Sequence, residues 1–152
     1  MLYNGTGIPI FFVKQTDSGV IDMRTVTAAI LIRGDKVFIG QRKAGKQLEN
    51  LWEFPGGKLE NGETQRECLV REMREEFGVE VAVQEFFGES IYHYIHGSIR
   101  LVAYLVEWID GEMSPVDHQD CRWVSFDDLK SYEFVPADVP FVQKLMKDHN
   151  AL

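Results

Sequence analysis

The stretch GKLENGETQRECLVREMREEFGV, from Gly57 to Val79, decides the fold of this chain. Thr64 and Glu67 within it have the spacing of a capping box, which starts a helix. Gly78 stands where a residue in the left-handed conformation ends one. The sequence therefore predicts a single helix over Gln65 to Phe77.

Three glutamates share one face of this helix. Glu72, Glu75 and Glu76 follow one another at i, i+3 and i+4, beside an apolar stripe that would pack against a core. Carboxylates crowded in this way repel one another unless cations neutralise them, and Mg²⁺ prefers oxygen ligands that it shares with substrate phosphates. The pattern indicates either a magnesium site beside the glycines or a solvated acidic face.

Strand patterns lie on both sides of the helix. The expected strands are Ile8 to Lys14, Val20 to Met23, Arg24 to Arg33, Lys36 to Arg42, Leu51 to Phe54, Val79 to Phe87, Ile91 to Ile95, Ser98 to Trp108 and Cys121 to Val124. A His96-Gly97 turn should join two of these strands. Ser125 with Asp128 would cap a brief helix, and Asp138 would open an amphipathic C-terminal one. The order predicts an α/β protein.

Composition limits the class of protein. A chain of 152 residues, 45% of them hydrophobic, fits one compact domain. The formal net charge of −8 argues against a nucleic-acid polymer as partner, because binding a phosphate backbone needs an excess of basic residues. No segment reads as a signal peptide or a membrane span, and Cys68 and Cys121 suggest neither a zinc site nor a disulfide. We expect a cytoplasmic protein with no membrane contact.

The quoted stretch resembles the Nudix box at its full spacing. Seven fixed identities and two apolar positions match: Gly57, Glu63, Arg71, Glu72, Met73, Glu75, Glu76, Gly78 and Val79. A chance match has a probability on the order of 10⁻⁷. LWEFPGGK at Leu51 to Lys58, the Gln41-Arg42 pair, the Trp123 strand and PADVP at Pro136 to Pro140 are similar to the MutT branch of that family. This resemblance implies an α/β/α sandwich around a mixed sheet, and the predicted element order agrees with it.

The resemblance also implies a Mg²⁺-dependent enzyme, with Mn²⁺ as a substitute, that hydrolyses a nucleoside triphosphate to the monophosphate and pyrophosphate. The implied metal ligands are the Gly56 carbonyl and the carboxylates of Glu72, Glu75, Glu76 and Asp117. Glu72 is the candidate general base. Arg71 and Glu63 are interpreted as braces that orient these ligands. Asp117 stands where MutT-like enzymes usually carry glutamate, and a solvated loop aspartate is the alternative.

Four residues are candidate substrate contacts. Arg42 and Lys58 would donate to phosphates, or are plain surface cations. Phe54 is one of several possible stacking platforms, with Tyr92, Tyr94 and Trp123, although aromatic residues on strands are more often core. Ionised Asp138 could accept from the amino group of cytosine, a raised pKa would restore a guanine-type contact, and the alternative is that Asp138 only caps the last helix.

Two alternatives to this activity remain at this stage. The same box serves hydrolases of dinucleoside polyphosphates, nucleotide sugars or capped RNA, and a binding module could keep the fold without the chemistry. We divide the chain into an N-terminal hairpin extension over residues 1–23 and a Nudix domain over 24–152, with the box at 57–79. The apolar residues of the extension suggest that it packs at a homodimer interface or covers the chain's own core.

Overall fold

The computed structural model describes residues 2–3, 9–10, 23–95 and 97–151, with the side chains of 23–95 and 97–148. Near the N-terminus, strand β1 (Leu2–Tyr3) pairs with β2 (Pro9–Ile10), and the antiparallel register joins Leu2 to Ile10. Pro9 and Ile10 belong to the predicted strand Ile8–Lys14, and Met23, the last residue of the predicted strand Val20–Met23, instead begins the long strand β3. The other residues of that predicted hairpin lie outside the described residues, as does His96 of the predicted turn.

A mixed sheet forms the centre of the molecule. Its strands are β3 (Met23–Arg33), β4 (Lys36–Arg42), β5 (Trp52–Glu53), β6 (Gly56–Lys58), β7 (Glu80–Tyr94), β8 (Gly97–Asp110) and β9 (His118–Ser125). The order is β5-β4-β3-β8-β7, with β6 also paired to β3 and β9 to β4. Only β3 and β8 run parallel among these pairs. Such a pair needs a long crossover, and the α1 segment lies within it.

The helix α1 (Gln65–Phe77) has the predicted bounds. The Thr64 side chain accepts a hydrogen bond from the Glu67 backbone N–H, and Gly78 ends the helix with a φ of 70°. The second helix, α2 (Val139–Ala151), follows two short 3₁₀ helices, η1 (Phe126–Ser131) and η2 (Pro136–Asp138). Ser125 caps η1 through the Asp128 N–H, as predicted.

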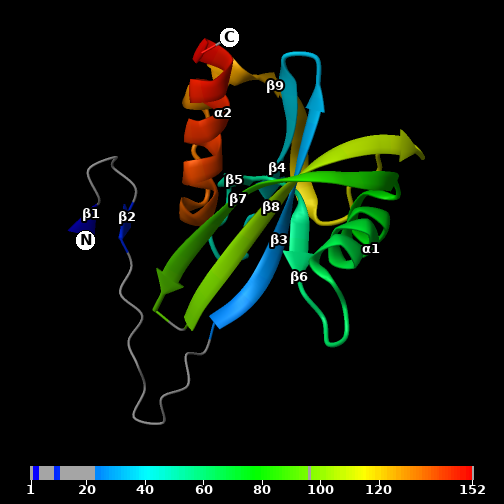
Figure 1. Ribbon diagram of the computed structural model, residues 1–152, viewed down its shortest axis with the longest axis horizontal. Coiled ribbons are helices and arrows are strands. Elements are labelled where there is room, and N and C mark those ends of the chain that lie inside the picture. Colours follow the sequence, from blue (N-terminus) through cyan, green and yellow to red (C-terminus); the bar gives the residue numbers. More distant parts are fainter. Residues whose placement is uncertain (1, 4–8, 11–22, 96, 152) are drawn as a thin grey trace.

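The two long helices cover opposite faces of the sheet (Figure 1). Residues Leu69, Met73 and Phe77 of α1 are buried against alternate residues of β3, with Ala29 and Leu31 on that face. The other face of β3 packs against α2 in a separate cluster. This burial on both faces confirms the predicted sandwich and explains why β3 is apolar at every position of its centre.

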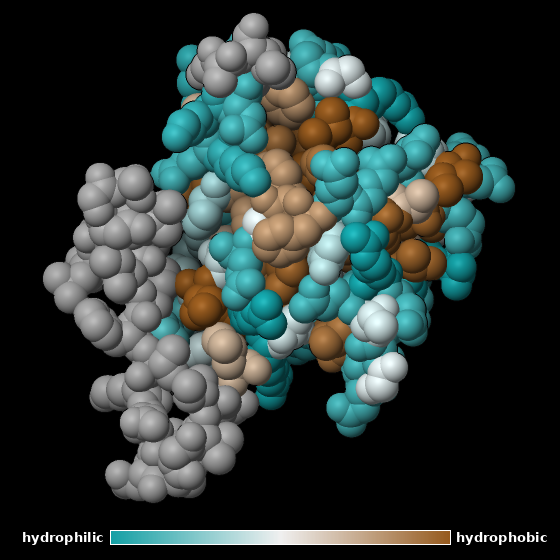
Figure 2. Space-filling view, in the orientation of Figure 1, coloured by the Kyte–Doolittle hydropathy of each residue, from teal (hydrophilic) through white to brown (hydrophobic). Residues whose placement is uncertain are grey.

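Hydrophilic side chains dominate the face seen in Figure 2, with apolar residues in smaller areas between them.

Both α1 and α2 have 13 residues, and no helix in the described part of the chain is long and apolar enough to cross a membrane.

Two strand predictions were wrong in length. The expected strands Val79–Phe87 and Ile91–Ile95 are one continuous strand, β7, whose pairing with β8 shifts register three times between Glu80 and Gly88. The residues between the two expected strands, Gly88 to Ser90, pair in regular register with Ala103 to Leu101 of β8, so the strand does not break there. The expected strand Cys121–Val124 is also longer, because β9 pairs with the whole of β4.

The segment Gly56–Lys58, called the glycine loop below, forms β6 and packs closely against the backbone of β3. Gly56 pairs with Ala28, and a Cβ added to Gly56 would overlap the carbonyl oxygen of Thr27. Because this neighbour is backbone, it cannot rotate away. Glycine is therefore required at residue 56 for β6 to reach the sheet.

We predict that Gly56→Ala lowers the free energy of unfolding by about 3 kcal/mol, the upper range for a steric insertion into a packed site. Gly34→Ala is the control, since Gly34 has a φ of 63° but open space around it. Gly34→Ala should lower the free energy of unfolding by only about 1 to 2 kcal/mol, because alanine is strained in the left-handed conformation. Equal losses for the two variants in urea unfolding would contradict the steric account.

Candidate active site

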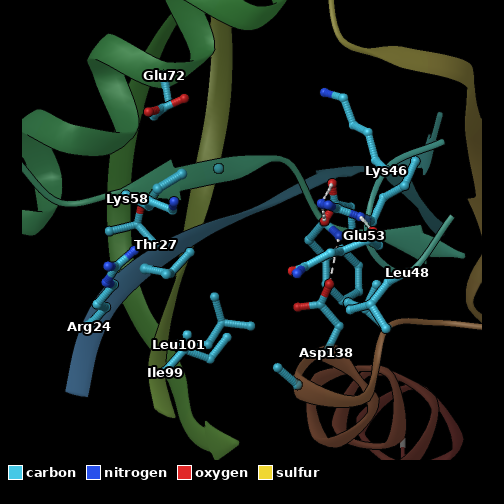
Figure 3. Close-up of a pocket in the computed structure, with 18 of the residues that line it drawn as sticks. Arg24, Thr27, Lys46, Leu48, Glu53, Lys58, Glu72, Ile99, Leu101 and Asp138 are labelled. Atoms are coloured by element: carbon cyan, nitrogen blue, oxygen red, sulfur yellow. Dashed lines mark hydrogen bonds and ion pairs between the residues drawn. The ribbon is translucent and has the colours of Figure 1, made fainter. Parts of the chain in front are cut away.

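One cavity of about 650 Å³ brings together residues from both halves of the chain. It lies between the glycine loop, the glutamate face of α1 and the short helix η2 (Figure 3). Eight residues predicted for the site line it: Arg42, Phe54, Gly56, Lys58, Glu72, Glu76, Asp117 and Asp138. Three others, Glu63, Arg71 and Glu75, are not among its lining residues. Eight of the eleven predicted site residues thus lie in the wall of one cavity, together with other residues that were not predicted.

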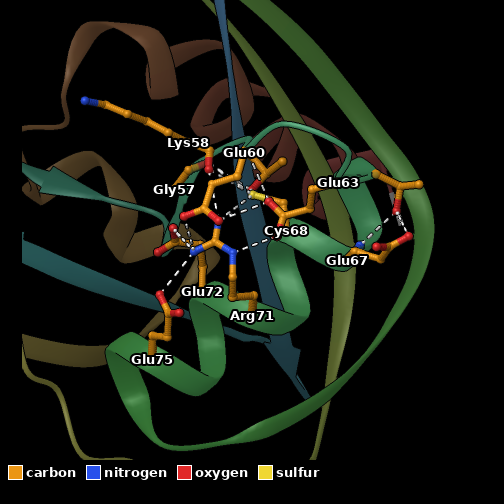
Figure 4. A network of polar contacts seen from close by, with 11 residues as sticks. Gly57, Lys58, Glu60, Glu63, Glu67, Cys68, Arg71, Glu72 and Glu75 are labelled. Atoms are coloured by element: carbon orange, nitrogen blue, oxygen red, sulfur yellow. Dashed lines mark hydrogen bonds and ion pairs between the residues drawn. The ribbon is translucent and has the colours of Figure 1, made fainter.

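Arg71 joins α1 to the loop that precedes it (Figure 4). Its Nε and Nη2 donate to the two carboxylate oxygens of Glu63 at 2.6 and 3.0 Å. Its Nη1 donates to Glu72 at 2.9 Å and to Glu75 at 3.1 Å, and Nη2 also reaches the Lys58 carbonyl at 3.0 Å. The hydrogen bonds from Arg71 lower the pKa of Glu63 to about 2. This geometry is that of the predicted brace.

Glu72 faces the glycine loop at the centre of the cavity. Its side chain is 13% exposed, and burial raises the pKa of its carboxyl despite the neighbouring Arg71. A Cβ on Gly57 would overlap the Glu72 carboxylate, so glycine is needed here for the carboxylate to approach the loop. Glu72 is therefore held, rather than free to sample solvent.

Glu76 carries the clearest sign of a missing partner. Its Oε2 is buried and has no hydrogen-bond partner among the described residues. A buried carboxylate oxygen without a partner is costly, and a cation would remove that cost. Glu72 and Glu76 line one cavity beside backbone oxygens of the loop, so this donor set fits a divalent cation.

The described residues do not form a complete metal cage. Within them, no three acidic, histidine or cysteine side chains are placed to hold an ion together. Glu75 is 58% exposed and pairs with Arg71, and Asp117 pairs with Lys46 at 2.5 Å, which lowers the Asp117 pKa. An ion at Glu72 and Glu76 would thus leave coordination positions for phosphate oxygens, as Mg²⁺ usually does.

Asp138 lies at another end of the cavity and is 2% exposed. Its Oδ2 accepts a hydrogen bond from the Phe54 backbone N–H at 3.1 Å. Burial, followed by the charge of Glu53, raises the pKa of Asp138 well above its usual range. Asp138 belongs to η2, and the described hydrogen bonds do not join its carboxylate to α2. They give no support to the alternative that it only caps the last helix.

Two residues that were not predicted stand behind Arg42: Glu53 bonds it directly, and His118 bonds Glu53. Glu53 accepts from Arg42 Nη1 at 3.2 Å, and His118 Nε2 lies 3.0 Å from the Glu53 Oε1 atom. His118 is nearly buried and stacks on Phe77 at the end of α1. Glu53 lies within the LWEFPGGK segment, but nothing in that segment indicated a contact with Arg42. His118 precedes the predicted strand Cys121 to Val124, where it looked like an exposed loop residue.

The aromatic candidates fall into two groups. Phe54 and Tyr94 line the cavity, and burial raises the pKa of Tyr94 to about 12. Trp123 instead packs against Phe38 and Arg33 outside the cavity lining, so its interpretation as a stacking platform was wrong. Tyr92 is also absent from that lining.

Both cysteines are free thiols. Cys68 is buried behind the glycine loop, with its Sγ 3.3 Å from the Thr27 hydroxyl. Burial raises the pKa of each thiol to about 11. Neither thiol is therefore reactive at neutral pH.

Comparison with known proteins gives the same assignment as the motif. The model of the NUDIX domain matches residues 23–145. The CTP pyrophosphohydrolase of Escherichia coli is 38% identical over 82% of this chain and 92% of its own length. The 8-oxo-dGTP diphosphatase of Escherichia coli is 35% identical over 74% of this chain and 88% of its own length.

Solved structures agree in fold. The solution structure of the E. coli ORF135 protein superposes with a TM-score of 0.75 and 36% identity, over 86% of this chain and 94% of that one. A MutT protein from Methanosarcina mazei reaches the same TM-score at 16% identity over 85% of this chain and 96% of that one, which supports the fold alone. Because the family model spans most of the chain and close relatives match over nearly their full length, this chain belongs to the Nudix family.

Proposed function

We propose that this protein hydrolyses a nucleoside triphosphate to a nucleoside monophosphate and pyrophosphate in the presence of Mg²⁺. One observation carries the proposal: Glu72 and Glu76 share a cavity with a buried polar residue, Asp138, suited to a nucleobase. The relatives named as CTP pyrophosphohydrolase and 8-oxo-dGTP diphosphatase support a triphosphate as substrate.

The residues that would hold Mg²⁺ are Glu72 and Glu76, with the Gly56 carbonyl, and Glu75 and Asp117 as further candidates. A bound divalent ion would acidify water and neutralise charge on the pyrophosphate, and Mn²⁺ would serve in its place. Arg71 keeps the Glu72 carboxylate in position through the 2.9 Å hydrogen bond. The unpartnered Oε2 of Glu76 is the oxygen most in need of a cation.

Glu72 is the proposed acceptor of the proton from the attacking water. Its carboxylate faces the cavity, and its raised pKa lets it take up a proton more readily than an exposed glutamate. Arg71 stays charged beside it, since the hydrogen bonds that it donates to Glu63 and Glu72 raise its own pKa. The arginine therefore limits how far the Glu72 pKa rises and keeps the base ionised before reaction.

Asp138 supplies the proposed contact to the base. Because Oδ2 already accepts from Phe54, a proton on this buried carboxyl belongs on Oδ1, which then donates. A donor suits an acceptor on the base edge, such as O6 of an oxidised guanine or N3 of cytosine. This protonated form replaces the ionised form on which the sequence argument for the cytosine amino group depended.

The proposed reaction is tested with a panel of nucleoside triphosphates, including CTP and 8-oxo-dGTP, incubated with Mg²⁺ and followed by ³¹P NMR. We expect pyrophosphate and monophosphate as products, and no turnover after chelation with EDTA. Release of inorganic phosphate, or turnover of only dinucleoside polyphosphates or nucleotide sugars, would contradict the proposal.

We predict that Glu76→Gln keeps the fold and lowers kcat about 100-fold or more, because charge stabilisation used in the transition state is lost. Steady-state kinetics with saturating Mg²⁺ measures this. Glu80→Gln is a matched control, since Glu80 lies close in sequence but pairs with Arg74 outside the cavity lining. Turnover near that of the wild type in Glu76→Gln would overturn the metal assignment.

A second prediction concerns pH. Asp138 donates only while protonated, so KM should rise as pH passes upward through its raised pKa. Stability should fall from the ordinary pKa of aspartate up to that raised pKa and then level off, because only in this interval does the folded chain hold a proton that the unfolded chain has lost. Asp138→Asn has an amide oxygen for Phe54 and an N–H for the base at every pH. We expect this variant to stay active with a KM that no longer rises with pH.

Asp138→Leu completes the comparison because it removes both contacts and leaves the Phe54 N–H unpaired, at a cost of about 1 to 3 kcal/mol. The measurement is KM and melting temperature across a pH series. If Asp138→Asn and wild type give superimposable pH profiles, Asp138 does not act through its proton.

A further inference from the structure

Arg24 and Lys58 lie together at one side of the cavity, away from Asp138 (Figure 3). Lys58 pairs with Val26 across β6 and β3, and Arg24 precedes Val26 by two residues. Residues two apart on a strand share a face, so Arg24 and Lys58 are diagonal neighbours on adjacent strands. Sheet register, rather than loop position, therefore brings these two cations together.

Neither cation has an acidic partner within the described part of the chain. The other basic residues of this cavity differ, because Arg42 pairs with Glu53 and Lys46 pairs with Asp117. No ion pair or side-chain hydrogen bond involves Arg24 or the Lys58 ammonium group there. In a chain of net charge −8, two adjacent unpaired cations facing a cavity favour an anionic ligand.

The position of this pair indicates which part of the substrate it meets. Lys58 follows Gly57, which lies against the Glu72 carboxylate, so the pair borders the proposed site of cleavage. Asp138 lies at the other side of that site. A nucleotide with its base at Asp138 and its scissile bond at Glu72 would extend its remaining phosphates toward Arg24.

We propose that Arg24, together with Lys58, binds the terminal phosphate of the nucleoside triphosphate and, after cleavage, the pyrophosphate product. The inference rests on the proposed function and deepens it. Lys58 alone was a candidate phosphate contact from the sequence, but Arg24 was not. The guanidinium would donate charge-assisted hydrogen bonds to a group that diphosphates lack. Arg24 therefore selects triphosphates over diphosphates of the same base.

The test compares Arg24→Gln with Arg100→Gln. Arg100 carries the same charge, pairs in register with Thr25 and so lies on the opposite face of the sheet, where it bonds Glu89. For Arg24→Gln we expect KM for the triphosphate to rise about tenfold, the loss of one hydrogen bond to a charged group. KM for the matching diphosphate should not change, and Arg100→Gln should match wild type with both. Equal changes for the two substrates would overturn the proposal.

A binding measurement without metal separates this inference from the catalytic proposal. Isothermal titration with inorganic tripolyphosphate should give binding by wild type and Arg100→Gln, and binding about tenfold weaker in Arg24→Gln. Arg24→Lys should recover part of the loss, and melting temperatures verify that all variants fold. If Arg24→Gln binds tripolyphosphate as tightly as wild type does, the proposed phosphate site is contradicted, even if triphosphates are hydrolysed. If tripolyphosphate binding is weaker in Arg24→Gln but wild type does not hydrolyse triphosphates, only the catalytic proposal is contradicted.

Discussion

The hydrogen bonds of Arg71 are the interaction on which the rest of this site depends. One guanidinium joins Glu63 of the loop, Glu72 and Glu75 of α1 and the carbonyl of Lys58 on β6. Without it, acidic side chains on neighbouring segments would repel one another, and only the pairing of β6 with β3 and the weaker Cys68 contacts would hold the loop near the helix. The planar fork of arginine reaches these partners in fixed directions, which the compact ammonium group of lysine could not do.

The charged side chains are distributed unevenly along the cavity. Glu63, Glu72 and Glu75 share the single positive charge of Arg71, whereas Glu76 retains a buried oxygen without a partner among the described residues. At one side, Arg24 and Lys58 are cations without acidic partners in the same part of the chain. At the other, Arg42 is balanced by Glu53, and burial favours the neutral form of Asp138. A ligand with a neutral base and a polyanionic tail matches this gradient when a divalent cation bridges its centre.

The parts of the fold predicted best were those with local causes. The bounds of α1 follow from Thr64 and Gly78, which act within a few residues of the helix ends. The continuity of β7 was missed because Gly88 to Ser90 remain in the strand through their pairing with β8, which the β7 sequence does not reveal. Short-range patterns therefore located the helix but not the full length of its neighbouring strands.

The residues of the candidate site were likewise predicted where the cause is local and missed where it is not. The glutamates and glycines were found because the motif fixes their spacing, and the hydrogen bond of Asp138 could not be found because Phe54 is 84 residues away. Glu53, His118 and Arg24 were missed for a related reason. Each looks like an ordinary polar position until register places it in the cavity.

The central claim is that Glu72 and Glu76, held beside the glycine loop by Arg71, form the site of a divalent cation. Anomalous diffraction from crystals grown with Mn²⁺ and a non-hydrolysable nucleoside triphosphate analogue tests it directly. The account predicts a manganese peak bonded to Glu76 Oε2 and Glu72, bridging to the phosphates, with Arg71 still bonded to Glu63. A manganese peak elsewhere, with the Glu76 carboxylate unligated while the analogue occupies the cavity, would contradict it.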